Sequence, residues 1–134
     1  MDASIELPDG WVDRTVLTYV GPDAGEGSPS LVVTRDELTP DITLGRYASM
    51  QDAAIRAGLE GVDLVEERET TVAGRPAVRH TYVWTLDGRT IRQRVWCLLE
   101  GDTGYAITAS APESQFDELR PQFARAVASF AVTG

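Results

Sequence analysis

The stretch RPAVRHTYVWTLDGRTIRQRVWCLLE, residues 75–100, predicts a long β-hairpin. Its two arms, Arg75–Leu86 and Thr90–Glu100, are rich in Val, Thr, Tyr, Trp and Ile, which favour strands. The dipeptide Asp87-Gly88 between them is a favoured two-residue hairpin turn, because both residues tolerate positive φ. Strands joined in this way pair antiparallel, so the stretch predicts an antiparallel sheet at the centre of the fold.

Further strands and two helices are predicted on either side of this hairpin. The strands are expected at Ser4–Leu7, Arg14–Val20, Ser30–Asp36, Val62–Val72 and Tyr105–Ser110. The loop Gly21–Pro29 joins two of them as an antiparallel pair. The first helix is expected at Thr43–Gly58, with Thr43 as its N-cap, and the second at Pro112–Phe130, kinked or restarted at Pro121.

This order of elements, β-β-β-α-β-β-β-β-α, predicts an α+β fold. We expect an antiparallel β-sheet with two helices packed on it, both on one face. A length of 134 residues favours one domain, residues 1–134.

Alternation along the hairpin leaves apolar residues on both faces of the predicted sheet. Trp84 and Val95 lie on one side, and Trp96 and Leu98 on the other. Two helices on one face would leave the second face to be covered by something else or to act as a binding surface. The alternative is that large aromatic side chains such as Trp84 and Trp96 are simply half-buried.

The charge of the chain excludes two classes of partner. Its net charge is −9, all twelve basic residues are arginine, and no lysine is present. Such a chain is repelled by nucleic-acid phosphates and by anionic membrane surfaces, so we expect neither nucleic-acid binding nor membrane insertion. The sequence begins without a basic-then-apolar stretch, which predicts a cytoplasmic protein.

The sequence carries no recognisable catalytic or metal-binding motif. His80 and Cys97 are the only residues of their kinds, and this pair falls short of the four ligands of a zinc site or of a complete catalytic constellation. Glu66, Glu67 and Glu69 are close in sequence, but neighbouring arginines favour cross-strand ion pairs over acid–base chemistry. We therefore expect no enzyme activity, no cofactor and no metal.

Two amides stand out among apolar neighbours. Gln51 interrupts the apolar stripe of the first helix, and Gln93 lies between Ile91 and Val95. A buried amide requires hydrogen bonds. Each amide is either satisfied inside the core or offers hydrogen bonds to a bound polypeptide.

Several motifs together resemble a known family. They are the helix with Gln51, the closing helix around Phe123 and Phe130, and the strings Leu7-Pro8-Asp9-Gly10-Trp11-Val12-Asp13, Leu31-Val32-Val33-Thr34-Arg35, Gly74-Arg75-Pro76-Ala77 and Arg92-Gln93-Arg94. In their order and spacing, the chain resembles the DcrB-related proteins from about Ser4 to Val132. Within that family it is similar to the Eag-type chaperones of type VI secretion effectors.

The resemblance implies a Mog1/PsbP-like fold, a homodimer and a non-enzymatic chaperone. Such a protein binds and shields the hydrophobic, transmembrane-like N-terminal segment of a Rhs/PAAR-type effector. By similarity, the effector-segment binding residues are Leu17, Tyr19, Ser30, Val32, Thr34, Gln51, Ile55, Leu59 and Gln93. The alternative is a ligand-binding or scaffold module on the same fold without an effector client, because fold alone does not decide function.

Overall fold

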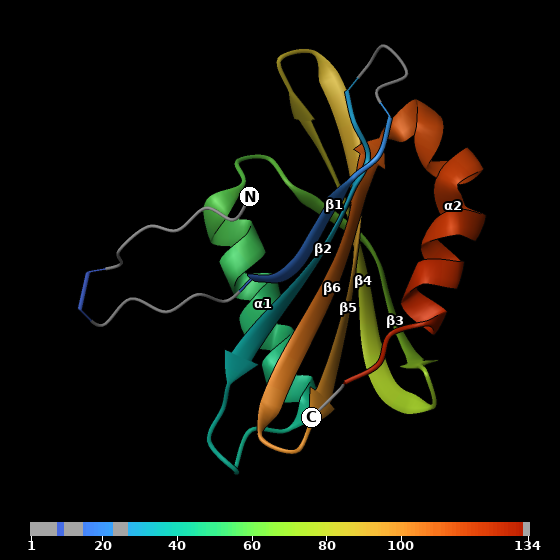
Figure 1. The fold of residues 1–134 in the computed structure, drawn as a ribbon. Helices are drawn as coiled ribbons and strands as arrows, with labels where there is room; N and C mark the ends of the chain where they lie inside the picture. The colour runs from blue at the N-terminus through green and yellow to red at the C-terminus, as the bar shows by residue number, and fades with distance from the viewer. Residues whose placement is uncertain (1–7, 10–14, 23–26, 133–134) are drawn as a thin grey trace.

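The computed structural model describes residues 8–9, 15–22 and 27–132 (Figure 1). The predicted strand Ser4–Leu7 lies outside the described residues, as does Trp11 of the family motif. Six strands and two helices follow one another in the order β1 Thr15–Val20, β2 Ser30–Glu37, α1 Leu44–Gly58, β3 Asp63–Val72, β4 Arg75–Leu86, β5 Arg89–Glu100, β6 Thr103–Pro112 and α2 Glu113–Ala128.

The six strands form one antiparallel sheet in the order β1-β2-β6-β5-β4-β3. The predicted hairpin is confirmed as β4–β5, and its turn residues Asp87 and Gly88 adopt φ values of 52° and 76°. The predicted antiparallel pairing of the strands on either side of the Gly21–Pro29 loop is also confirmed, as β1 and β2. The predicted α+β class with a central antiparallel sheet is therefore correct.

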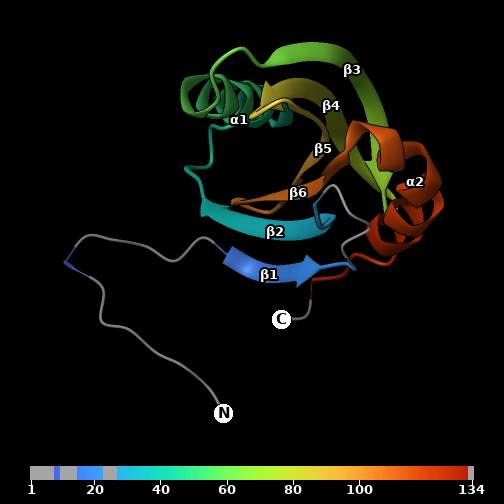
Figure 2. The ribbon, with the colours of Figure 1, turned by 90° about the horizontal axis from the view of Figure 1, so that it is seen from above.

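The two helices lie on opposite faces of the sheet, so the expectation that both cover one face is wrong (Figure 2). Alternate residues of β5 show the separation. Val95 and Cys97 pack in a core with Tyr47 of α1, whereas Trp96 and Leu98 pack in a second core with Phe116 and other residues of α2. Both faces of the central strands are apolar because each face receives its own helix.

The first helix begins as the sequence predicts. Thr43 caps it, since the backbone N–H of Arg46 donates a hydrogen bond to Thr43 Oγ1 at 3.1 Å. On the same helix, the Tyr47 ring lies directly on Gly104 of β6, where an added Cβ would come within 2.5 Å of the ring. Gly104 therefore sets how closely α1 approaches the sheet.

The second helix, α2, is one continuous element from Glu113 to Ala128 and contains Pro121. It buries Phe116, Phe123 and Val127 against the sheet. Among the described residues, neither helix is long and apolar enough to cross a membrane.

Candidate functional site

A band of small side chains crosses four strands on the face that carries α1. The strand registers place Ser30 of β2 beside Ser110 of β6 and Ser110 beside Gln93 of β5. One row along, Val32 of β2 lies beside Thr108 of β6. We call this set the α1-face band and define it as Thr18, Ser30, Val32, Thr34, Gln93, Thr108 and Ser110.

The α1-face band is accessible and uncharged. Thr18 is exposed, and the other members are half-buried. Large apolar side chains lie at the end of β1, where Val20 is 68% exposed, and at the end of the neighbouring strand β4, where Leu86 is 62% exposed. The band thus combines hydroxyl and amide groups with apolar contact area. This combination suits a long apolar partner that still carries hydrogen-bonding groups.

Helix α1 lies on the same face and is tied to the sheet at one edge by Asp36 of β2. The Tyr47 hydroxyl donates to Asp36 Oδ2 at 2.9 Å, and Gln51 Nε2 donates to the same oxygen at 3.1 Å. The Gln51 amide is therefore already bound within the chain through its nitrogen. Its position beside Asp36 fixes the side of α1 that faces β2.

A second polar contact lies further along α1. The Tyr82 hydroxyl donates to Asp52 Oδ1 at 2.6 Å and lies 3.2 Å from His80 Nδ1. Burial alone would raise the pKa of Asp52, but hydrogen bonds from Tyr82 and Arg56 outweigh it and hold the pKa below its usual value. Burial, reinforced by Asp52, raises the pKa of Tyr82. Asp52 is thus held as a carboxylate against a neutral phenol.

The structure brings seven of the nine predicted binding residues to this one face. Ser30, Val32, Thr34 and Gln93 lie in the α1-face band, and Gln51, Ile55 and Leu59 lie on or next to α1. Ile55 packs against the core beneath α1, and Leu59 directly follows the helix as its C-cap. All seven side chains are half-buried.

The other two predicted residues, Leu17 and Tyr19, lie on the opposite face. Leu17 pairs with Val33 and Tyr19 with Leu31, and these partners of β2 pack in the core with α2. Leu17 is 43% exposed and Tyr19 60% exposed. The two residues line a separate cavity between β1 and the end of α2.

Sequence reasoning missed Thr108 and Ser110, which occupy the middle of the α1-face band. The signal in the sequence that could have identified them is their alternation with buried Ile107 and Ala109 along β6. That alternation becomes informative only when β6 is known to lie between β2 and β5, a pairing between strands far apart in the sequence.

Two comparisons show what the fold resembles. A crystal structure of a Pseudomonas aeruginosa protein of unknown function, PA94, superposes with a TM-score of 0.77 at 21% identity, over 98% of this chain and 92% of that one. The solution structure of cyanobacterial PsbP from Synechocystis superposes with a TM-score of 0.57 at 18% identity, over 95% and 84% of the two chains. The expected Mog1/PsbP-like fold is confirmed.

A third comparison comes from sequence. Effector EagT6 of Pseudomonas aeruginosa is 28% identical over 94 residues, which are 69% of this chain and 65% of that protein. The match thus spans just under two thirds of the relative. The DcrB family matches residues 2–129, nearly the whole chain. The chain therefore belongs to the DcrB family.

Proposed function

We propose that this protein is an effector-associated chaperone of type VI secretion. It binds the hydrophobic, transmembrane-like N-terminal segment of a Rhs/PAAR-type effector and shields that segment from water. The observation that carries the proposal is the α1-face band, a half-buried, uncharged surface that spans four strands beside α1. The protein acts without catalysis, in the cytoplasm and as a homodimer.

The similarity to Effector EagT6 supports this role, because that relative carries the Eag designation of the chaperones that the sequence resembles. Membership of the DcrB family agrees with it. The type of client and the dimeric state are proposed for this chain by extending that similarity.

The chemistry of the α1-face band supports an apolar helical client. Burial of apolar surface is favourable by about 25 cal/mol per Å², so a segment built to cross a membrane gains strongly from leaving water. Within the band, Val32 offers apolar contact. Ser30, Ser110 and Gln93 can meet the small polar side chains with which membrane helices pack against one another.

Co-expression tests the proposal. The full chain is produced together with the tagged hydrophobic N-terminal segment of a Rhs/PAAR effector encoded beside its gene, and soluble complex is measured after affinity purification. Wild-type protein should keep the segment soluble. Val32→Arg and Ser110→Arg, which place charge and bulk in the α1-face band, should reduce the recovered segment at least tenfold.

Leu17→Arg is the matched control, since it introduces the same side chain at an exposed position on the opposite face. It should leave the yield of complex unchanged. Loss of complex in Leu17→Arg alone would move the binding surface to the α2 face. Failure of the wild-type protein to retain any such segment would refute the proposal, provided that circular dichroism shows the protein to be folded.

A further inference from the structure

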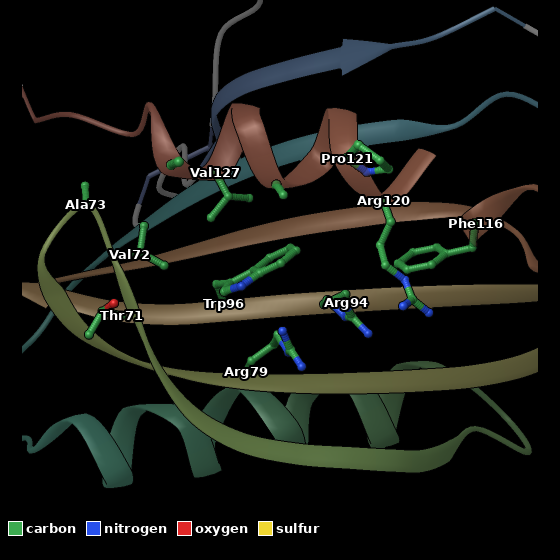
Figure 3. Close-up of a pocket in the computed structure, with 12 residues that line it drawn as sticks. Thr71, Val72, Ala73, Arg79, Arg94, Trp96, Phe116, Arg120, Pro121 and Val127 are labelled. Atoms are coloured by element: carbon green, nitrogen blue, oxygen red, sulfur yellow. The ribbon is translucent and has the colours of Figure 1, made fainter. Parts of the chain in front are cut away.

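A cavity lies on the opposite face of the sheet, between α2 and strands β3–β5 (Figure 3). Its volume is about 640 Å³, within the range of pockets that hold small organic ligands. Trp96 of β5 lies on its floor, and Val72, Ala124 and Val127 add apolar walls. This part of the cavity can accept an apolar group a few carbon atoms long.

The same cavity has a cationic end. Arg79, Arg94 and Arg120 line it together, and Figure 3 shows their side chains gathered beside the rings of Trp96 and Phe116. These three arginines also line an adjoining hollow of about 590 Å³ with Arg68 and Arg92. Five of the twelve arginines of an acidic protein thus gather at one place.

The arginines are incompletely neutralised. Arg79 is paired with Glu66 at 2.6 Å, Arg92 with Glu113 at 2.8 Å and Arg120 with Asp117 at 2.6 Å. Among the residues that the structure describes, five guanidinium groups therefore face the three carboxylates of these ion pairs, which leaves an excess of two positive charges. The predicted cross-strand ion pairing is confirmed by Arg79 and Glu66, but it does not balance the cluster.

Arg94 has the greatest need of an anion. The residue is only 9% exposed, and its Nε donates to Thr81 Oγ1 at 3.1 Å. Its Nη2 is 3.9 Å from Glu66 Oε1, too far for a hydrogen bond. Burial, followed by the charge of Arg79, lowers the pKa of Arg94. A bound anion would offset both effects.

We propose that this cavity binds a small amphipathic carboxylate. The carboxylate lies against Arg94 and Arg120, whose planar guanidinium groups match its two oxygens. The apolar body of the ligand packs on Trp96 beneath Ala124 of α2. The site lies on the face opposite the α1-face band and is independent of the effector client.

Sodium octanoate is the probe for the test, titrated into ¹⁵N-labelled full-length protein. The readout is the indole N–H resonance of Trp96, assigned with Trp96→Phe. Octanoate should shift this resonance saturably. Acetate lacks the apolar body and 1-octanol lacks the charge, so each should bind at least tenfold more weakly.

Variants on the exposed side of α2 test the two halves of the site without disturbing the core. Arg120→Gln should weaken octanoate binding about fivefold. Ala124→Phe, which fills the apolar part, should weaken it at least tenfold. Arg125→Gln is the matched control, because it removes the same charge from the same helix at an exposed position that does not line the cavity, and its affinity should stay within twofold of wild type.

The proposal is overturned if octanoate produces no saturable shift of the Trp96 resonance, or if 1-octanol binds as tightly as octanoate. It is also overturned if Ala124→Phe binds like wild type, or if Arg125→Gln weakens binding as much as Arg120→Gln. None of these outcomes bears on capture of an effector segment by the α1-face band.

Discussion

The two helices are held to the same sheet by different chemistry. Under α2, Phe116, Phe123 and Val127 are buried against an apolar core. Under α1, Tyr47 and Ala48 are the buried residues. Hydrogen bonds to carboxylates tie α1 to the sheet, from Tyr47 to Asp36 and from Tyr82 to Asp52.

The difference separates stability from binding. An apolar seal such as that under α2 gains free energy in proportion to the area removed from water. Hydrogen bonds to carboxylates anchor α1 at a few points, so the α1-face band beside it stays half-buried. More buried apolar side chains lie in the core with α2 than in the core with α1, so we expect the α2 face to contribute more of the folding energy.

The largest effect that distinguishes the faces is expected from Phe116→Ala. Phe116 is 1% exposed and packs against Phe123 with ring centroids 5.5 Å apart. Removing a buried phenylalanine ring leaves a cavity and should lower the free energy of unfolding by about 3–5 kcal/mol. Chemical denaturation followed by tryptophan fluorescence measures this loss.

Ile55→Ala is the counterpart on the α1 face. Ile55 is half-buried, so its truncation should cost less than half as much as Phe116→Ala. Equal losses of stability in the two variants would mean that α1 is sealed as tightly as α2, and the contrast between the faces would fail.

A smaller, pH-dependent effect is expected from Tyr82→Phe. The variant loses a part-buried hydrogen bond to a carboxylate, which should cost about 1.5–3 kcal/mol at pH 7. The pKa of Asp52 is lowered in the folded state, so its ionised form stabilises the fold above the unfolded pKa, near 3.9. That stabilisation is lost as the pH falls through the folded pKa. The difference between variant and wild type should therefore shrink in acid.

Tyr105→Phe is the matched control for Tyr82→Phe. Tyr105 is buried on the α2 face, and within the described part of the chain its hydroxyl makes no hydrogen bond. The same substitution there should change stability by less than about 0.5 kcal/mol at any pH. A Tyr82→Phe loss that stayed constant from pH 7 to pH 3 would contradict the role of Asp52 as its partner.

Local sequence signals account for most of the fold. Asp87-Gly88 identifies the central hairpin, and Thr43 identifies the start of α1. Which face of the sheet each helix covers could not be predicted, because Val95 and Trp96 are both apolar and either side of β5 could receive a helix. The side is set by the path of the chain, which carries α1 from β2 and α2 from β6 over different faces.

The candidate binding surface was predicted only in part, for the same reason. Ser30, Val32 and Thr34 share a face through simple alternation along one strand. Leu17 and Tyr19 pair with Val33 and Leu31, so they lie on the opposite face from Ser30, Val32 and Thr34, with which the resemblance groups them. The arginine-lined cavity escaped notice because Arg120 and Phe116 reach Arg94 only through the packing of α2.

The smallest expected effect concerns Cys97, which lies on the α1 face in the core beneath Tyr47. Burial, together with the charge of Asp36, raises the pKa of the Cys97 thiol to about 12. The folded state then keeps this proton at a pH where the unfolded chain, with a cysteine pKa of about 8.5, has lost it. Because the folded state binds more protons there, stability falls as the pH rises.

Between pH 7 and pH 9.5, wild-type protein should therefore lose about 1 kcal/mol more of its unfolding free energy than Cys97→Ala does. Urea denaturation at the two pH values measures the difference. The cost in stability of the cavity left by the substitution cancels, because the cavity is present at both pH values. Cys97 is the only cysteine, so no other thiol contributes. An identical loss of unfolding free energy at alkaline pH in both proteins would mean that solvent reaches Cys97 beneath α1. The hydrogen bonds that anchor this helix would then leave the core beneath it accessible to water.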